Sequence, residues 1–258
     1  MQKWRTHFKD RLHDAYIEIV NTEEDYSKDP ISFTLDGVTF KGGGIGDFAP
    51  IESDIQRACE RFNILKSGGF EMGGEDVPYW YELQRYSLET EIPVTVVRGA
   101  DGGEVQGSLH ISFEYTEHDP EKTQAQYYLG DERVYHDDMR VDDFSLTVEG
   151  ERFASGRKTL CFESALIDIC SQIKDRYYLK CCLTCQYSDY SPYGNDDFGT
   201  MQCFIRQKEN YLKVNSKPDY FEHLNTGHGD YELRQETYLC GSYEIRNRCE
   251  GYRGLVPL

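Results

Sequence analysis

Apolar and polar residues alternate along much of the first half of the chain, and this period of two is typical of β-strands with one buried face. The pattern predicts strands over residues 15–20, 31–40, 79–85, 91–98, 105–115 and 144–148. Asp36-Gly37 divides the second of these runs, so we expect a hairpin with a tight turn there. The Gly-rich stretch 100–103 predicts a second hairpin between two later strands.

Two other stretches have apolar residues at helical spacing. One covers residues 50–65 and ends before Gly68-Gly69, and the other covers 162–177 with a continuous apolar stripe. Cys59 and Cys170 lie on these stripes, so both are predicted to be small core residues. Many strands and only two helices predict an α+β fold with a mainly antiparallel sheet. The Gly-rich run 42–46 lacks the dinucleotide fingerprint and the P-loop lysine, which favours a loop without phosphate chemistry.

Charge is distributed unevenly over the 258 residues, whose formal net charge is -18. Residues 1–175 hold 18 Lys and Arg against 35 Asp and Glu, a net of -17, whereas residues 176–258 hold 10 against 11. A negative field of this size repels nucleic acid and anionic lipid and attracts basic proteins. The alternative interpretation is that the charge serves solubility alone.

Hydrophobic segments of the length needed for a membrane span or a secretory signal are missing from the sequence. We therefore expect a cytoplasmic protein with no membrane contact. In that compartment the nine cysteines are expected to be thiols or metal ligands and not disulfides.

Cysteines gather in the last third of the chain, beginning with Cys181, Cys182 and Cys185. The spacing Cys182-x2-Cys185 is that of a zinc knuckle, in which two thiolates from one turn bind the same ion. Further ligands must come from downstream, and the spacing does not choose among Cys203, Cys240 and Cys249. Buried thiols without metal and a redox dithiol are the alternatives. Because residues 176–258 have few large aliphatic residues, we expect a zinc-stabilised module there, after an acidic β-rich domain at 1–175.

Several motifs carry a resemblance to a known family. They are CLTCQYSDYSPYG at 182–194, FGTMQC at 198–203, ETYLC at 236–240, GYRG at 251–254 and LDGVTF at 35–40. Together they resemble a bacterial family described only as a domain of unknown function, over most of the chain. The resemblance implies that the recurring cysteines are Cys182, Cys185, Cys203 and Cys240, and that Cys181 and Cys249 are extra. It implies no activity.

None of the seven histidines lies in a recognisable catalytic motif. A zinc ion bound by four cysteines has no open position for a substrate. We therefore expect a non-enzymatic protein that binds a basic protein partner, for instance an immunity protein that neutralises a nuclease toxin. The alternatives are a zinc-stabilised structural or scaffolding subunit and an unrecognised hydrolase. The loop 187–198 is a candidate partner surface, because aromatics and acids suit a basic partner. Its candidate residues are Tyr187, Asp189, Tyr190, Tyr193, Asp196 and Asp197. The alternative is that these tyrosines pack on the zinc knuckle.

Overall fold

A computed structural model of the chain describes residues 1–72, 75–116, 139–157, 162–192, 198–224 and 231–246. Its main feature is a ten-stranded antiparallel sheet with the order β13-β12-β11-β10-β1-β2-β3-β4-β5, to which β14 is added by pairing with β10. The strands are β1 (Gln2–Lys9), β2 (Asp14–Asn21), β3 (Ile31–Leu35), β4 (Val38–Gly42), β5 (Ala49–Pro50), β10 (Tyr86–Arg98), β11 (Glu104–Tyr115), β12 (Met139–Val148), β13 (Glu151–Ala154) and β14 (Tyr177–Leu179).

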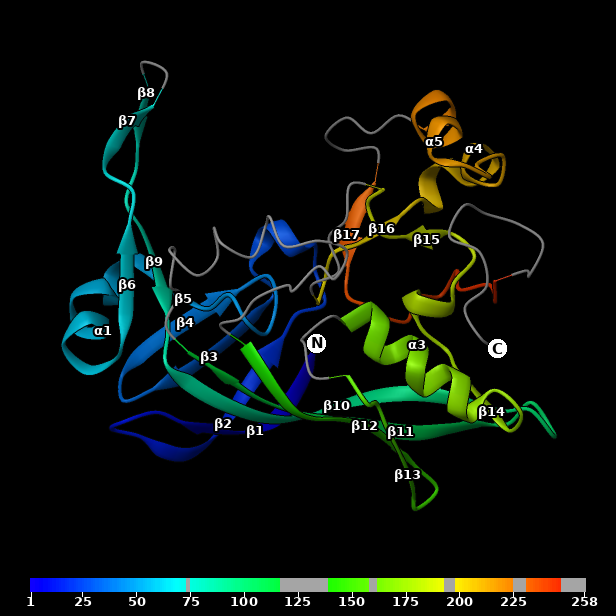
Figure 1. The fold of residues 1–258 in the computed structure, drawn as a ribbon, viewed down its shortest axis with the longest axis horizontal. Coiled ribbons are helices and arrows are strands. Elements are labelled where there is room, and N and C mark those ends of the chain that lie inside the picture. Colours follow the sequence, from blue (N-terminus) through cyan, green and yellow to red (C-terminus); the bar gives the residue numbers. More distant parts are fainter. Residues whose placement is uncertain (73–74, 117–138, 158–161, 193–197, 225–230, 247–258) are drawn as a thin grey trace.

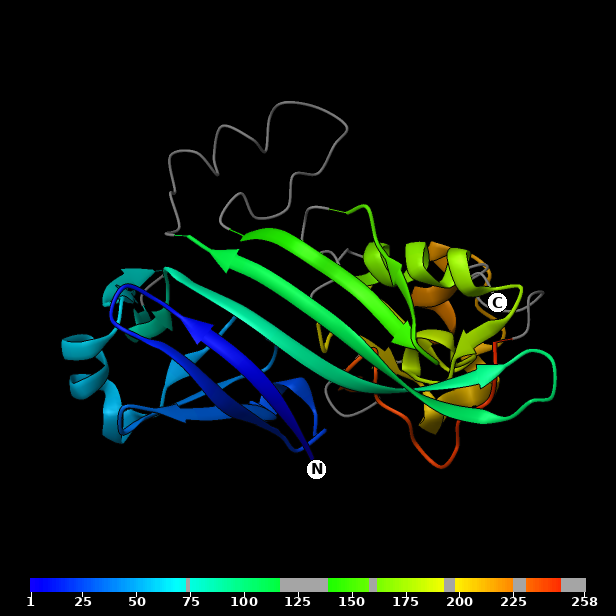
Figure 2. The same ribbon diagram turned by 90° about the horizontal axis from the view of Figure 1, so that it is seen from below.

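One face of this sheet forms the core, because its side chains alternate as the sequence pattern predicts. Along β10, for example, Leu88 and Ile92 are buried while Glu89 and Glu91 are exposed. Helix α3 (Phe162–Ile173) buries its apolar stripe, Cys170 included, on the inner side of the β10–β12 half (Figures 1 and 2). The predicted α+β class and the burial of Cys170 are thereby confirmed.

Proline in the long strand β10 has a structural explanation. Residues Ser87–Thr90 of β10 pair with β1, and residues Val96–Arg98 pair with β14 on the same edge. Pro93 lies between these two pairings, where a missing N–H costs no ladder hydrogen bond. The strand can therefore change partners at Pro93 and bring the cysteine-rich part of the chain onto the sheet.

Both predicted hairpins are present. Asp36 and Gly37 have positive φ angles of 48° and 74° between β3 and β4, as a tight two-residue turn requires. The segment 100–103 connects β10 to β11, with Gly102 at a φ of 70°. In the Gly-rich loop that follows β4, the N–H groups of Gly43 and Gly44 donate to the partly buried Asp47 carboxylate. These two donors are therefore occupied by the protein itself.

The first predicted helix is shorter than expected. A 3-10 turn, η2 (Glu52–Asp54), leads into α1 (Ile55–Arg61), and the chain then becomes strand β6 (Ile64–Ser67), which pairs with β9 (Trp80–Leu83). Cys59 is exposed, so its prediction as a core residue was wrong. The helix ends at Arg61 because the chain then pairs with β9 as strand β6. The apolar stripe predicted over 50–65 is therefore divided between a helix and a strand, and it did not predict which side chains are buried.

A projecting β-arm follows directly. It consists of β6 and β9 and, farther out, β7 (Phe70–Met72) paired with β8 (Glu75–Val77). In Figure 1 this arm, in cyan, stands out from the body of the molecule at the upper left.

No helix in the described part of the chain is long and apolar enough to cross a membrane.

The cysteine-rich part has its own three-stranded sheet, β15-β16-β17. Its elements are η3 (Cys182–Thr184), β15 (Ser188–Asp189), β16 (Met201–Cys203), η4 (Ile205–Gln207), α4 (Lys208–Tyr211), α5 (Lys217–His223) and β17 (Glu232–Arg234), while η1 (Tyr26–Lys28) belongs to the N-terminal part. Cys182, Leu183, Phe198 and Met201 pack into the main core cluster. Only a smaller cluster around Phe204, Tyr211 and Tyr220 is separate. The boundary at 176 stays a prediction, and the two parts share a core across it.

Phe198 connects these parts and provides a stability test. Its buried ring lies 5.9 Å from Trp4 of β1 and 4.8 Å from Phe162 of α3. Phe198→Ala would leave a cavity between three elements, so we expect a loss of about 3–5 kcal/mol in the free energy of unfolding, measured by urea denaturation. Phe221→Ala, at an exposed phenylalanine of α5, should cost less than about 1 kcal/mol. Equal losses in the two variants would contradict the bridging role.

Candidate functional site: the cysteine cluster

The turn at η3 positions the first two cysteines. The N–H of Cys185 donates to the carbonyl of Cys182 at 3.1 Å, which holds the two residues on one turn. Cys181 is the N-cap of this turn: its sulfur accepts from the backbone of Thr184, and the Thr184 hydroxyl accepts from the Cys181 N–H. Cys181 therefore has a local capping role, which uses its thiol within the turn.

Two more cysteines reach this turn through backbone pairing. Ser188, three residues after Cys185, pairs with Cys203 between β15 and β16. The N–H of Cys182 donates to the carbonyl of Tyr238, two residues before Cys240, at 2.8 Å. Beyond Cys240 the chain turns, with the Tyr243 N–H donating to the Cys240 carbonyl, and returns to form a bridge between Ile245 and Cys185. The fold thus brings together the segments that carry Cys182, Cys185, Cys203 and Cys240, and the ligand set named from the sequence stays a prediction.

The electrostatics of these thiols reflect their proximity. Burial raises the pKa of Cys182 well above its ordinary value, and the neighbouring thiols of Cys203, Cys185, Cys181 and Cys240 raise it further. Burial also raises the pKa of Cys185 and of Cys203, and Cys240 adds to both increases. Each thiolate would therefore be disfavoured beside the others unless a cation compensated their charge.

Backbone N–H groups point at two of the sulfurs. The N–H groups of Tyr187 and Glu244 donate to the Cys185 sulfur, and that of Ile205 donates to Cys203, in each case opposing the rise in pKa caused by burial. Such donors stabilise a thiolate. Within the described residues, no three His, Cys, Asp or Glu side chains are arranged as a ready set for a metal ion. Cys249, the other candidate ligand, lies outside the described residues.

The predicted partner loop is placed differently from expectation. Tyr187, Asp189 and Tyr190 are buried, and Tyr193, Asp196 and Asp197 lie outside the described residues. The Tyr187 hydroxyl donates to Glu244 at 2.8 Å, while Asp189 accepts from the Tyr211 hydroxyl at 2.9 Å. These contacts support the alternative in which the tyrosines pack around the cysteine turn. Buried as they are, the three described residues offer a partner no accessible surface.

Two buried charged residues complete the site and were not singled out from the sequence. Glu236 accepts from the Tyr190 hydroxyl at 2.7 Å and from the Gly199 N–H at 2.9 Å. Arg246 donates to the carbonyls of Cys185 and Ser188 and so ties the C-terminal return to the turn. Glu236 belongs to the ETYLC motif, and this motif is the sequence feature that could have indicated it. No sequence feature indicated Arg246.

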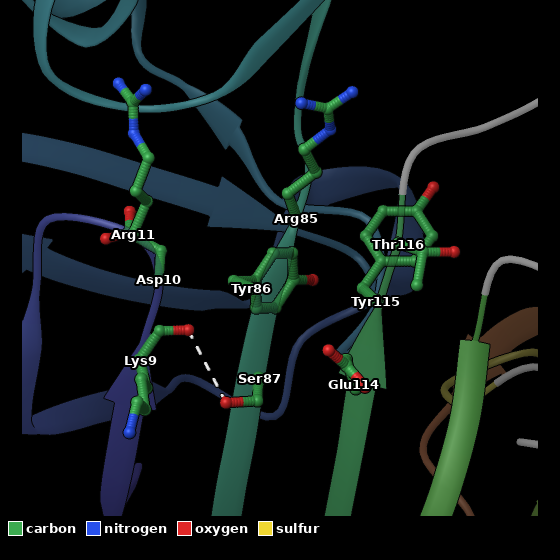
Figure 3. A pocket seen from close by; sticks show the side chains of 9 residues that line it. All are labelled: Lys9, Asp10, Arg11, Arg85, Tyr86, Ser87, Glu114, Tyr115 and Thr116. Carbon is green, nitrogen blue, oxygen red and sulfur yellow. Dashed lines mark hydrogen bonds between the residues drawn. The ribbon is translucent and has the colours of Figure 1, made fainter.

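A hollow of about 440 Å³ opens elsewhere, at the end of β10 opposite to the one that pairs with β14 (Figure 3). Arg11 and Arg85 stand at its rim, and the Tyr86 ring lies among its walls. Asp10 is already engaged, because it accepts from the N–H groups of residues 12 and 13 in the turn after β1. The second acid of the hollow, Glu114, pairs with Arg140 at 3.0 Å, so both acids already have partners within the protein.

Comparison with protein families gives a match over most of the chain. A protein family described as a family of unknown function (DUF6304) matches residues 2–188. The match covers the large sheet, α3 and the Cys182–Cys185 turn, and it confirms the resemblance to a family of unknown function. It includes the motif at 35–40 and the start of the one at 182–194, whereas the motifs at 198–203, 236–240 and 251–254 lie beyond it. Neither a curated protein nor a solved structure is significantly similar to the chain.

Proposed function

The chain belongs to this family of unknown function, and from its own residues we propose that it is a non-enzymatic binding protein for a basic protein partner. The observation that carries the proposal is the net charge of -17 on residues 1–175. Even if each of the 18 cations in that range paired with one carboxylate, 17 carboxylates would remain without a cation from the same range. Such an excess attracts a basic protein and disfavours nucleic acid.

Ion pairs within the structure already use many of its cations. Arg98 pairs with Glu149, Arg152 with Asp143 and Arg176 with Glu151. Carboxylates that stay unpaired would gain cations from a basic partner. The specific form that we propose is neutralisation, in the cytoplasm, of a basic toxin such as a nuclease, whose cationic surface the carboxylates would cover in place of nucleic acid.

A structural zinc ion is the second part of the proposal. Cys182, Cys185, Cys203 and Cys240 would bind it, drawing four neighbouring sulfurs into a tetrahedral set at about 2.3 Å from the ion. The backbone links among the three segments and the N–H groups aimed at Cys185 and Cys203 support this assignment. Four protein ligands leave no open position, so the ion would stabilise the fold of the cysteine-rich part and not activate a substrate.

Association kinetics test the binding function. The immobilised chain would first be used to isolate a binding protein, which would then be identified, purified and measured at about 50 mM and about 300 mM salt. We expect a basic partner whose association rate falls about 10-fold or more with added salt, because steering is screened, while its dissociation rate changes little. An acidic or neutral partner, or a salt-independent association rate, would contradict the proposal. Metal-dependent turnover of a small molecule would contradict it as well.

A further inference from the structure

The hollow at the end of β10 has more cationic than acidic side chains in its wall. Its volume of about 440 Å³ is that of a small-molecule site. Three cations and two acids line it: Lys9, Arg11, Arg85, Asp10 and Glu114. Lys9 pairs with Asp14 at 3.3 Å, and Glu114 pairs with Arg140. Arg11 differs from them, because within the described part of the chain its side chain forms no hydrogen bond or ion pair.

Arg11 has no carboxylate partner in a chain with a formal net charge of -18. Ion pairs hold other arginines of the same two thirds of the chain, namely Arg57, Arg61, Arg98, Arg140 and Arg152. Asp10 precedes Arg11, but its Oδ1 accepts from the N–H groups of residues 12 and 13 and lies 2.9 Å from the His13 Nδ1. The turn therefore uses the neighbouring acid and leaves the guanidinium group of Arg11 for another anion.

The turn that carries Arg11 is well fixed. The Asp10 N–H donates to the His13 carbonyl at 2.9 Å, and the Asp10 side chain is only 2% exposed. The His13 ring in turn stacks on Phe62, with 4.4 Å between the ring centres. Because this packing fixes the backbone at Arg11, an anion would meet a site that is partly preorganised, and binding would cost less conformational entropy.

Arg85 reaches the hollow through an uncommon backbone conformation. It lies between β9 and β10, and its φ of 58° is in the left-handed region, which is unfavourable for a residue with a long side chain. In Figure 3 its side chain extends in the same direction as that of Arg11. Strained residues of this kind gather at binding sites, where the surrounding structure maintains them. The conformation is thus a second, independent observation that marks the hollow as a site.

We propose that this hollow binds a small organic phosphate, whose phosphate group is held by the guanidinium groups of Arg11 and Arg85. A guanidinium group donates two parallel N–H bonds to phosphate oxygens, and a phosphate dianion matches two such groups better than a single carboxylate does. The organic part would lie against the tyrosines of the wall, Tyr86 and Tyr115 (Figure 3).

The charge of the whole protein favours a small anion over a large one. A polyanion such as nucleic acid would meet the negative field of residues 1–175 along its whole length. A small phosphate is governed by the charges within a Debye length, about 8 Å at physiological salt, and these include the cations of the hollow. The site is separate from the proposed binding of a basic protein, and neither inference depends on the other.

Phenyl phosphate is the probe, because it combines a phosphate dianion with one aromatic ring. Calorimetry at constant ionic strength should show one site per full-length chain, with weaker binding of inorganic phosphate and none of phenol. Arg11→Gln should weaken phenyl phosphate binding about tenfold or more, because it removes the charged donors. The control Arg157→Gln, at an exposed arginine outside the lining of the hollow, should change the affinity less than about twofold.

Arg85→Gly separates binding from folding. Glycine adopts a positive φ without strain, so the variant should unfold within a few degrees of the wild-type temperature, while its affinity for phenyl phosphate falls about tenfold. A lowered unfolding temperature with unchanged affinity would show that Arg85 serves the fold alone and would overturn its role in binding.

Three results would overturn the site itself. They are a wild-type protein that binds neither phosphate, full affinity in Arg11→Gln, and equal weakening in Arg11→Gln and Arg157→Gln. Tighter binding of succinate than of phenyl phosphate would overturn the assignment of the ligand as a phosphate. Each of these results leaves the proposed association with a basic protein intact, since that association is measured with a different partner and by its salt dependence.

Discussion

Freshly purified, reduced protein should contain about one zinc ion per chain, and replacement of any of Cys182, Cys185, Cys203 or Cys240 by serine should abolish it. Serine is a poor zinc ligand, and losing one of four thiolates opens the site. Since structural zinc contributes roughly 10–16 kcal/mol of apparent folding free energy in small modules, this is the largest effect we expect from any single substitution. Elemental analysis gives the stoichiometry, and thermal unfolding gives the loss of stability.

The chain offers close controls for this experiment. Cys181→Ser lies next to a proposed ligand, yet serine can still cap η3, so zinc should be retained with little change in stability. Cys59→Ser, at an exposed position of α1, should also retain zinc. Loss of zinc in Cys181→Ser but not in Cys182→Ser would show that Cys181, and not Cys182, binds the ion. Metal-free reduced wild-type protein would contradict the site as a whole, and zinc lost from Cys249→Ser but kept in Cys203→Ser would identify a different fourth ligand.

Removal of zinc by a chelator should release the cysteine-rich part while most of the sheet stays folded. We expect hydrogen exchange to become fast in β16 and β17 and in the segment around Cys240, because the proposed zinc ion would hold these segments to η3. Amides of β1, β10 and β11 should keep their protection, because their ladders pair them with each other within the large sheet.

The shared core predicts where this unfolding stops. The Phe198 ring packs on Trp4 and Phe162, and Asn21 and Gln235 exchange two buried hydrogen bonds of 2.7 and 2.9 Å. Protection should therefore decline gradually from the second core cluster toward β14 and not end sharply at residue 176. Uniform loss of protection over the whole chain would show one cooperative unit, and unchanged protection would show that no metal supports the cysteine-rich part.

Local patterns in the sequence predicted β2, β3, β4, β9, β10, β11, part of β12, the two hairpin turns and α3, but not β1 in the middle of the sheet. These signals are short-range: alternation defines the buried face of β10 and β11, and Asp36-Gly37 defines a turn. The stripe predicted at 162–177 defines a helix that ends at Ile173, while Tyr177 begins β14. The four cysteines were chosen as zinc ligands because their residue type restricts their chemistry, and this choice stays a prediction. Backbone pairing brings the segments that carry them together, although Cys240 comes 55 residues after Cys185.

Contacts between distant segments decided the rest. The stripe at 50–65 did not reveal that residues 64–67 would leave the helix to pair with 80–83, which exposes Cys59 and builds the β-arm. Residues 187–190 look like a recognition loop in sequence, yet they are buried. Tyr187 donates to Glu244, Tyr190 donates to Glu236, and Asp189 accepts from Tyr211. A side chain's type determines what it can bind, whereas its burial depends on which remote segment packs against it, and only the tertiary structure supplies that partner.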